Sequence, residues 1–346
     1  MDHLLEPAPE PGDANVVKPP DLEHRRKHVE DLILTIKESA DKLATDGSTR
    51  GDLKLISRTL RELRYAFKVF TPYRKQRKVT VFGSARTQPD EPAFQEAIKL
   101  GKAMAEAEWL VVTGAASGIM EAGHIGAGRE HSMGLNIMLP FEQQANPVIL
   151  GDPKLVHMKY FFTRKLMFVK ECDAVVCLPG GFGTLDEAME VITLLQTGKR
   201  DMVPVVLLDP PGGTYWKGLD DFIRNHLLKG KMISPEDFSL YKVCDDYQVA
   251  VAEVLQFFKN YHSMRYVKQS LVLRMLQALE PELLEAINTE YRDILVSGAF
   301  VQRDSLPLEQ DEAEIAHLPR LVFHFNRRSF GRLRQLLDVI NRGRMA

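Results

Sequence analysis

Short apolar runs that alternate with helical stretches constrain the fold of this chain most. From residue 78 onward the runs are short enough for strands, and the segments between them carry apolar residues three and four positions apart. This alternation predicts an α/β fold with a doubly wound, Rossmann-like parallel sheet and right-handed connections. The expected strands are 79–82, 109–113, 135–139, 174–178 and 203–208.

Glycine-bearing turns follow three of these strands, at 83–86, 114–118 and 179–184. In a doubly wound sheet, ligands bind beyond the carboxyl ends of the strands, near the point where the strand order reverses. We therefore expect the three turns to converge on one crevice, although each turn alone could serve only the packing of a strand on a helix. The first turn lacks the Gly-x-Gly-x-x-Gly spacing of dinucleotide-binding folds, which argues against a redox enzyme.

The third turn, at 179–184, has the sequence of an anion site. Its glycines allow backbone N–H groups to approach a phosphate, and the helix expected from Asp186 presents further N–H groups at its start. Thr184 is placed to cap that helix or to bond a phosphate oxygen. Glu187 lies beside the loop, where its charge would repel a phosphate, so another task is expected for it.

A basic pair precedes this loop. Thr163 is expected to cap a helix that continues through Val169, which places Arg164 and Lys165 in its first turn. Cations are mildly disfavoured there by the helix dipole, so an anionic ligand is the natural compensation, although a solvated pair is the alternative.

These motifs resemble the signature of the LOG (Lonely Guy) family, whose members are often mislabelled lysine decarboxylases. The resemblance rests on Pro-Gly-Gly-x-Gly-Thr-x-x-Glu at 179–187 and on the preceding Arg-Lys pair, and it spans about residues 78–260. Characterised members are phosphoribohydrolases that cut the N-glycosidic bond of adenosine-type 5′-monophosphates and release base and ribose 5-phosphate. The segments 114–116 and 160–163 differ from the short members and resemble the longer bacterial branch, which is similar to nucleosidases that cleave several 5′-monophosphates.

The resemblance implies that Arg164 and Glu187 are catalytic. Bond cleavage builds positive charge on the sugar, which a carboxylate stabilises, while an arginine holds phosphate or ribose hydroxyls. The implied substrate is a purine-type nucleoside 5′-monophosphate, either AMP or a cytokinin riboside monophosphate, and no cofactor or metal is expected. The residues expected to bind the substrate are Gly83, Ser84, Arg86, Gly114, Gly118, Glu121, Lys165, Gly180, Gly181, Gly183 and Thr184.

The alternative is a non-catalytic protein of the same superfamily that binds a nucleotide or the molybdenum cofactor. Such proteins need the phosphate loop but not the paired Arg164 and Glu187, so the presence of both favours an enzyme. Release of adenine from AMP separates the two classes.

Composition narrows the class of protein and its location further. The chain has 346 residues, 45% of them hydrophobic and 27% charged, as in a soluble globular protein. A net charge of −2 gives no reason to expect nucleic-acid binding, and no apolar run is long enough to predict a membrane span. The three cysteines indicate reduced side chains and a cytoplasmic location, no pair of them has metal-ligand spacing, and the N-terminus does not resemble a signal peptide.

Four segments are expected along the chain. They are a proline-rich disordered tail at 1–20, a helical extension at 21–76, the nucleotide-binding domain at 77–261 and a small α/β appendage at 262–346. In the appendage, helices are expected at 271–279, 283–294 and 330–340, and a strand at 321–325.

The helical extension carries a strongly amphipathic stripe from Leu53 to Phe70. Its helices could pack on the next domain, form a subunit interface or cover the active site. The spacing of the stripe favours a homodimer or a larger even homo-oligomer.

Overall fold

The computed structural model of the chain describes residues 29–138, 144–309 and 312–345. The tail predicted at 1–20 lies outside the described residues, and so do residues 21–28 of the predicted helical extension. The chain forms two compact units, residues 1–60 and 61–346. Their boundary falls inside helix α3 (Arg50–Phe70), so the predicted domain ranges stay predictions.

The first unit consists of helix α2 (Glu30–Lys42) and the first half of α3. No residue of α2 is buried, and Leu53, Ile56 and Leu60 of α3 are exposed. The second half of α3 belongs to the other unit, where Ala66 and Phe70 are part of the hydrophobic core. Within one helix, therefore, the apolar stripe is exposed at one end and buried at the other.

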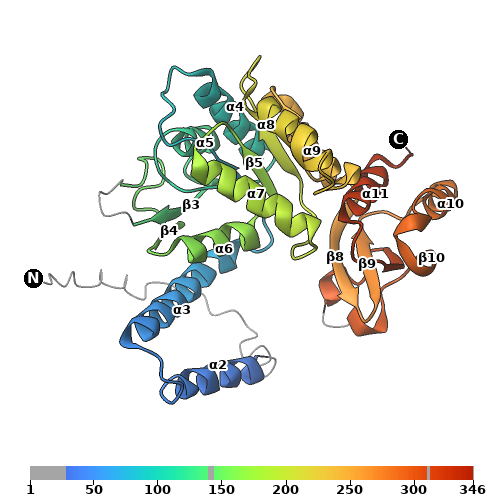
Figure 1. The fold of residues 1–346 in the computed structure, drawn as a ribbon, viewed down its shortest axis with the longest axis horizontal. Coiled ribbons are helices and arrows are strands. Elements are labelled where there is room, and N and C mark those ends of the chain that lie inside the picture. Colours follow the sequence, from blue (N-terminus) through green and yellow to red (C-terminus); the bar gives the residue numbers. More distant parts are fainter. Residues whose placement is uncertain (1–28, 139–143, 310–311, 346) are drawn as a thin grey trace, which may run out of the picture. The chain divides into compact units, whose positions relative to one another are not determined.

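A seven-stranded parallel sheet forms the centre of the second unit and confirms the predicted doubly wound α/β fold (Figure 1). Its edge strands β4 and β7 are absent from the sequence prediction because they are short and lack a continuous apolar run. Pro204 directly precedes β6, where a missing N–H costs no hydrogen bond of the strand. The strands are β1 (Lys78–Phe82), β2 (Leu110–Thr113), β3 (Ser132–Ile137), β4 (Leu155–Met158), β5 (Ala174–Cys177), β6 (Val205–Leu208) and β7 (Lys242–Cys244).

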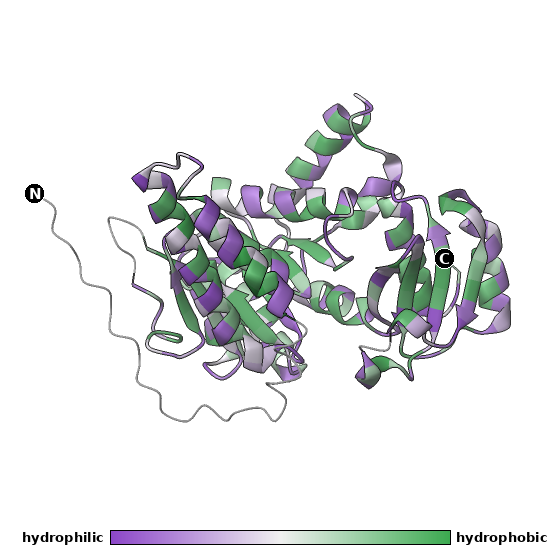
Figure 2. Ribbon diagram, turned by 90° about the horizontal axis from the view of Figure 1, so that it is seen from below, coloured by the Kyte–Doolittle hydropathy of each residue, from purple (hydrophilic) through white to green (hydrophobic). Residues whose placement is uncertain are grey.

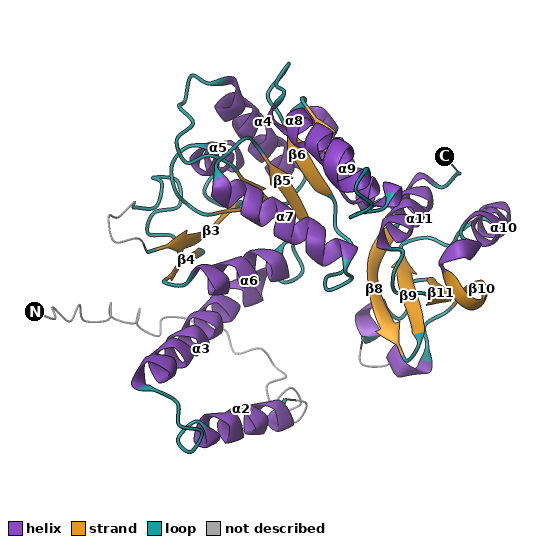
Figure 3. Cartoon of the chain, viewed as in Figure 1, coloured by secondary structure: helices purple, strands orange, loops and turns teal. Residues whose placement is uncertain are grey.

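Helices cover both faces of this sheet because successive strand residues point to opposite sides (Figure 3). Val175 and Cys177 of β5 face one layer, whereas Ala174 and Val176 face the other. The first layer contains the end of α3, α6 (Phe161–Glu171), α7 (Phe182–Gln196) and α8 (Tyr215–Phe222). The second layer contains α4 (Pro92–Glu106), α5 (Ile119–Ala127) and α9 (Tyr247–Phe257).

The strand order is β4-β3-β2-β1-β5-β6-β7, so the direction of winding reverses between β1 and β5. After β4 the chain returns to β1 and adds β5, β6 and β7 along the other edge of β1. The helices that follow β1 and β5 therefore lie on opposite faces of the sheet, and the carboxyl ends of these two strands are where such sheets bind ligands.

The C-terminal region forms a second, antiparallel sheet in the order β10-β11-β9-β8. The helix predicted at 271–279 is wrong, because most of this segment is strand β9. Its apolar run is short, and a short apolar run has no periodicity that distinguishes a helix from a strand. The elements are β8 (Tyr261–Val267), β9 (Ser270–Met275), α10 (Pro281–Glu290), β10 (Leu295–Arg303), β11 (Arg320–Phe325) and α11 (Phe330–Arg342).

Helix α11 joins the second sheet to the parallel-sheet region. The Phe330 ring packs on Gly198, where a Cβ atom would lie 1.9 Å from the ring. Asn341 Oδ1 accepts hydrogen bonds from the N–H groups of Asn260 (2.9 Å) and Tyr261 (2.8 Å). Figure 2 shows mainly hydrophobic strands in both sheets, and one hydrophobic core extends through both regions.

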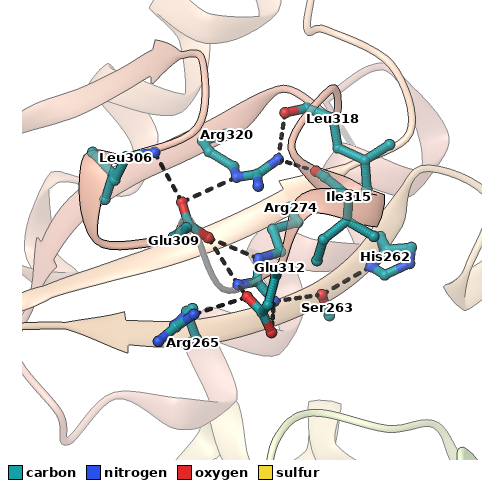
Figure 4. Close-up of polar contacts among 10 residues, drawn as sticks. All are labelled: His262, Ser263, Arg265, Arg274, Leu306, Glu309, Glu312, Ile315, Leu318 and Arg320. Carbon is teal, nitrogen blue, oxygen red and sulfur yellow. Dashed lines mark hydrogen bonds and ion pairs between the residues drawn. The ribbon is translucent and has the colours of Figure 1, made fainter. Parts of the chain in front are cut away.

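A buried ion cluster lies on the C-terminal sheet (Figure 4). Arg274 and Arg320 stand directly opposite each other on β9 and β11, an arrangement that repels unless a carboxylate intervenes. Glu309 supplies that carboxylate. Its Oε1 accepts from Arg274 Nε (2.9 Å), and its Oε2 accepts from Arg320 Nε (3.2 Å) and from the Leu306 N–H (3.1 Å).

Candidate functional site

A cavity of about 840 Å³ opens at the strand-order reversal. Residues of all three glycine-bearing turns line it, together with the first turns of α6 and α7, so the expected convergence is found. Of the predicted site residues, the cavity is lined by Gly83, Ser84, Arg86, Gly114, Arg164, Gly180, Gly181, Gly183, Thr184 and Glu187. Gly118, Glu121 and Lys165 are not part of its lining.

Backbone hydrogen bonds hold the three turns together. The Ser84 N–H donates to Pro179 O (3.1 Å), and the Ile119 N–H donates to Ser84 O (3.0 Å). Gly118 has a φ of +68°, and a Cβ atom there would lie 2.3 Å from Ser84 O. The contact between the two turns thus requires glycine at position 118. This requirement explains why the residue is glycine although it does not line the cavity.

The third turn leads directly into α7, which begins at Phe182 rather than at Asp186 as predicted. Its N-cap is Gly181 and no side chain caps it, so the predicted capping by Thr184 is wrong: this residue already lies within the first turn. The first N–H groups of a helix have no α-helical acceptor, and Phe182 and Gly183 line the cavity, so the start of α7 offers an anion site there. A Cβ atom on Gly181 would meet nothing within 4 Å, so open space adjoins this backbone.

Glu187 is buried, with 8% of its surface exposed, and lies in the second turn of α7. Burial raises the pKa of Glu187 to about 7, although the positive charges of Lys165 and Arg164 oppose the rise. Its Oε2 has no hydrogen-bond partner in the described part of the chain. A carboxyl group with such a pKa can exchange protons at neutral pH.

Arg164 lines the same cavity from α6, which begins at Phe161. The helix begins two residues before Thr163, so the predicted capping by Thr163 is wrong. Burial lowers the pKa of Arg164 while the charge of Glu187 opposes this, and the buried Nε has no hydrogen-bond partner in the described residues. The guanidinium carbon lies 5.2 Å from the centroid of the Phe161 ring. A buried guanidinium with an unused donor fits an anionic or hydroxyl-bearing ligand.

Lys165 points to α7 instead of the cavity. Its Nζ contacts Asp186 Oδ2 (2.6 Å) and Glu190 Oε2 (2.8 Å), which links the two helices beside the site. Its charge also acts on Glu187. The predicted contact of Lys165 with substrate stays a prediction.

The second turn is held by a buried polar network. Ala115 has a φ of +59°, in the left-handed region that favours glycine, and its N–H donates to Thr113 Oγ1 (2.9 Å). Thr113 Oγ1 lies 3.1 Å from Nε2 of the buried His124, whose pKa burial lowers to about 4. The neutral imidazole therefore serves the turn rather than catalysis. Glu121 is half-buried on the same helix, outside the cavity lining.

Several residues of the site are missing from the sequence prediction. Asn136 lines the cavity and is a buried polar residue between the apolar Leu135 and Ile137 near the carboxyl end of β3, a signal that could have been used. Phe161 and the 93% exposed Phe182 also line the cavity. The Tyr215 hydroxyl donates to Gly180 O (2.7 Å), a long-range contact for which the sequence has no signal.

Comparison with known proteins gives matches to the central domain. The family described as "Possible lysine decarboxylase" matches residues 113–254. A cytokinin riboside 5′-monophosphate phosphoribohydrolase of Arabidopsis thaliana is 36% identical over 151 residues, which cover 42% of this chain and 66% of the relative. A second such enzyme from Arabidopsis thaliana is 35% identical over 169 residues, which cover 46% of this chain and 74% of the relative.

The chain belongs to the LOG family. The chain spans about two thirds of the length of these two relatives. It spans 59% of the length of a rice LOG relative that is named as a probable enzyme of the same kind. The match to the family at 113–254 includes Arg164, Glu187 and the third turn but begins after the first turn. The roles of individual residues in this LOG protein stay predictions.

A solved structure of the molybdenum cofactor carrier protein from Chlamydomonas reinhardtii is also similar. It is 22% identical, and the match covers 52% of this chain and 97% of that protein with a TM-score of 0.37. A likeness at this level carries no argument about the function of the LOG protein.

Two kinds of feature are absent from the described residues. No helix among them is long and apolar enough to cross a membrane. No group of three or more His, Cys, Asp or Glu side chains in the same residues is arranged to hold a metal ion.

Proposed function

We propose that this chain is a phosphoribohydrolase that cleaves the N-glycosidic bond of a purine-type nucleoside 5′-monophosphate, with AMP as the simplest substrate. The observation that carries the proposal is the buried, unpartnered Glu187, whose pKa is raised to about 7, in the second turn of the helix that begins at the phosphate loop. One rigid helix thus offers N–H groups for a phosphate and a carboxylate for the sugar beside it. Membership of the LOG family supports the same reaction.

The reaction uses these two features in different ways. The bond from ribose C1′ to the base nitrogen breaks, its electron pair leaves with the base, and positive charge develops on the sugar. Ionised Glu187 stabilises that charge and accepts a proton from the water whose oxygen bonds to C1′. The departing base takes up a proton from solvent, and Glu187 returns its proton to solvent, so one water is consumed. Arg164 holds the phosphate or the ribose hydroxyls, for which its unused donor is available.

The first test is hydrolysis of AMP, followed by release of adenine. Glu187→Gln keeps the size and polarity of the side chain but removes its charge, so turnover is expected to fall about 100-fold or more, with AMP affinity kept or improved. Arg164→Ala is expected to lower both turnover and affinity. Glu106→Gln on the exposed side of α4 is the matched control and should change neither.

Two results would contradict this mechanism. Near-normal hydrolysis by Glu187→Gln removes the carboxylate from the reaction. Binding of several 5′-monophosphates without hydrolysis by the unmutated protein supports the non-catalytic alternative instead.

The second test addresses the phosphate loop. A valine at position 181 fits the unliganded fold, since a Cβ atom there meets nothing within 4 Å, but it fills the space beside the first N–H groups of α7. Gly181→Val is therefore expected to abolish AMP binding while thermal unfolding stays cooperative. Unchanged AMP affinity in a calorimetric titration would exclude the loop from the site.

The proposal extends to location and assembly. Three free cysteines, two of them buried, support a reducing, cytoplasmic compartment. The exposed stripe of α3 supports a homodimer or a larger even oligomer, since large apolar side chains on one helical face favour association. Light scattering that gives a mass of 39.2 kDa at micromolar concentration would contradict the oligomer.

A further inference from the structure

Glu62 of α3 is a buried carboxylate that the reaction above does not use. Its Oε1 accepts a hydrogen bond from the Lys159 N–H (2.9 Å), and its Oε2 lies 2.8 Å from Thr163 Oγ1. Both partners belong to the start of α6, one just before the helix and one in its first turn. A residue of the helical extension thus contacts the element that carries Arg164.

Helix α6 has no cap of its own. Its N-cap is Tyr160, whose side chain makes no capping hydrogen bond. The carboxylate of Glu62, which belongs to another helix, accepts from the Lys159 N–H just before α6 and from the Thr163 hydroxyl in its first turn, and its negative charge complements the dipole of α6. The sequence prediction that Thr163 caps α6 is thus replaced by a contact between Thr163 and Glu62.

The guanidinium of Arg164 depends on this arrangement. Its buried Nε has no hydrogen-bond partner in the described residues, and the contacts recorded for the group are two aromatic rings with centroids 5.2 and 5.7 Å from its central carbon. Among the described residues, therefore, no hydrogen bond fixes the buried Nε of this head group. The position of Arg164 is therefore set by the backbone of α6, which Glu62 holds on one side and the Lys165 pairs with α7 hold on the other.

We propose that Glu62 is a positioning residue for Arg164: it fixes the first turn of α6 so that the guanidinium stands in the cavity before substrate arrives. This inference rests on the proposed function for its kinetic consequence, but its geometric content is independent of it. It gives the helical extension a task in the site, through the half of α3 that belongs to the second unit (Figure 3).

A double-mutant cycle on the full-length protein tests the proposal. Glu62→Ala is expected to lower kcat/KM for AMP about 10- to 100-fold, the scale of a small misplacement of a catalytic group. In an Arg164→Ala background the same change should have almost no further effect on kcat/KM, because the group that Glu62 positions is gone. Its effect on the melting temperature should persist in both backgrounds. A merely structural role predicts equal losses of activity in both.

Three further variants keep the cycle interpretable. Thr163→Val removes one hydroxyl and should reproduce part of the kinetic loss if Glu62→Ala folds poorly. Arg64→Ala changes an exposed residue of the same helix and should leave kcat/KM unchanged. Glu62→Gln retains an acceptor without the charge and should recover part of the activity that Glu62→Ala loses.

A crystal structure of the Glu62→Ala variant separates this proposal from the proposed function. A displaced first turn of α6 and a displaced Arg164 support the positioning role even if the protein does not hydrolyse AMP. An Arg164 that keeps its place overturns the role even if AMP is hydrolysed, and so does full additivity in the cycle.

Discussion

Glu187 and Glu309 are both nearly inaccessible to solvent, but they lie among different partners. Burial tends to raise the pKa of each. At Glu309, hydrogen bonds from the Leu306 N–H, Arg274 and Arg320 outweigh the effect of burial, so the pKa of Glu309 is lowered. At Glu187, the more distant charges of Lys165 and Arg164 do not outweigh burial, and the pKa of Glu187 rises to about 7. The C-terminal sheet offsets the cost of a buried charge with close partners. In the cavity no such close partner offsets the cost of ionising Glu187, as is common at sites for ligands and catalysis.

The largest expected effect comes from breaking the paired site. Glu309→Ala removes the carboxylate that lies between the buried Arg274 and Arg320 and leaves Arg274 with its ion pair to Glu312, so we expect a loss of about 3–5 kcal/mol in the free energy of unfolding. Urea denaturation followed by circular dichroism measures it. The control is Glu314→Ala, which removes an exposed ion pair with Lys75 and should cost less than about 1 kcal/mol. Equal effects of the two variants would contradict the comparison.

The unpaired site should respond in the opposite direction. The pKa of Glu187 lies above its ordinary value of 4.5 in the folded chain, so folding binds a proton and stability falls as pH rises from about 4.5 to about 7. Glu187→Gln removes this penalty and should stabilise the protein above pH 7 by on the order of 2–3 kcal/mol. Denaturation at pH 8 and at pH 4.5 should show the gain only at the higher pH. A variant that is less stable than the unmutated protein at pH 8 would disprove the unpaired state of this carboxylate.

The same titration should appear in the kinetics. The proposed reaction needs ionised Glu187, so kcat/KM for AMP should rise with pH through about 7 and be about tenfold lower at pH 6 than at its plateau. The phosphate of AMP also titrates near pH 6. The residual activity of Glu187→Gln provides the control, because its profile retains only the titration of the substrate. A flat profile for the unmutated protein would argue against a role for this carboxyl group.

The smallest effect should come from Lys165. Its charge is the strongest influence that lowers the pKa of Glu187, although its contacts are with Asp186 and Glu190. Lys165→Met is expected to move the midpoint of the pH–rate profile upward. A profile measured in parallel for Lys102→Met, on the exposed surface of α4, should not move. If the midpoint moved downward, the electrostatic account of the site would be wrong.

The sequence predicts those parts of the site that consist of contiguous residues. The glycine turn, the strand before it and Glu187 lie within one short segment, and the order of strands and helices predicts that the three turns converge. The starts of α6 and α7 lie three and four residues before the predicted ones, because their N-caps are Tyr160 and Gly181 and not the threonines nearest to them. Neither helix start has a side-chain capping hydrogen bond, so the capping preference of threonine decides neither start.

Contacts between distant segments could not be predicted in this way. Glu62 and Thr163 are 101 positions apart, and nothing in either neighbourhood marks them as partners. The pairing of Arg274 with Glu309 was hidden as well, since residues 271–279 were predicted to be a helix and so gave no sheet on which Arg274 could face Arg320. A buried charge becomes visible only when the fold shows what surrounds it.

The junction at α11 has a consequence for how the protein is made. The residues that fill the space beside Gly198 and satisfy the backbone at Asn260 and Tyr261 belong to α11, and Asn341 follows Asn260 and Tyr261 by 81 and 80 positions. A ribosome therefore makes the parallel-sheet region before it makes this helix, although domains often begin to fold from the N-terminal side during synthesis. Until α11 has been made, one side of the core of that region stays open. During that interval chaperones can bind the apolar surface that α11 later covers.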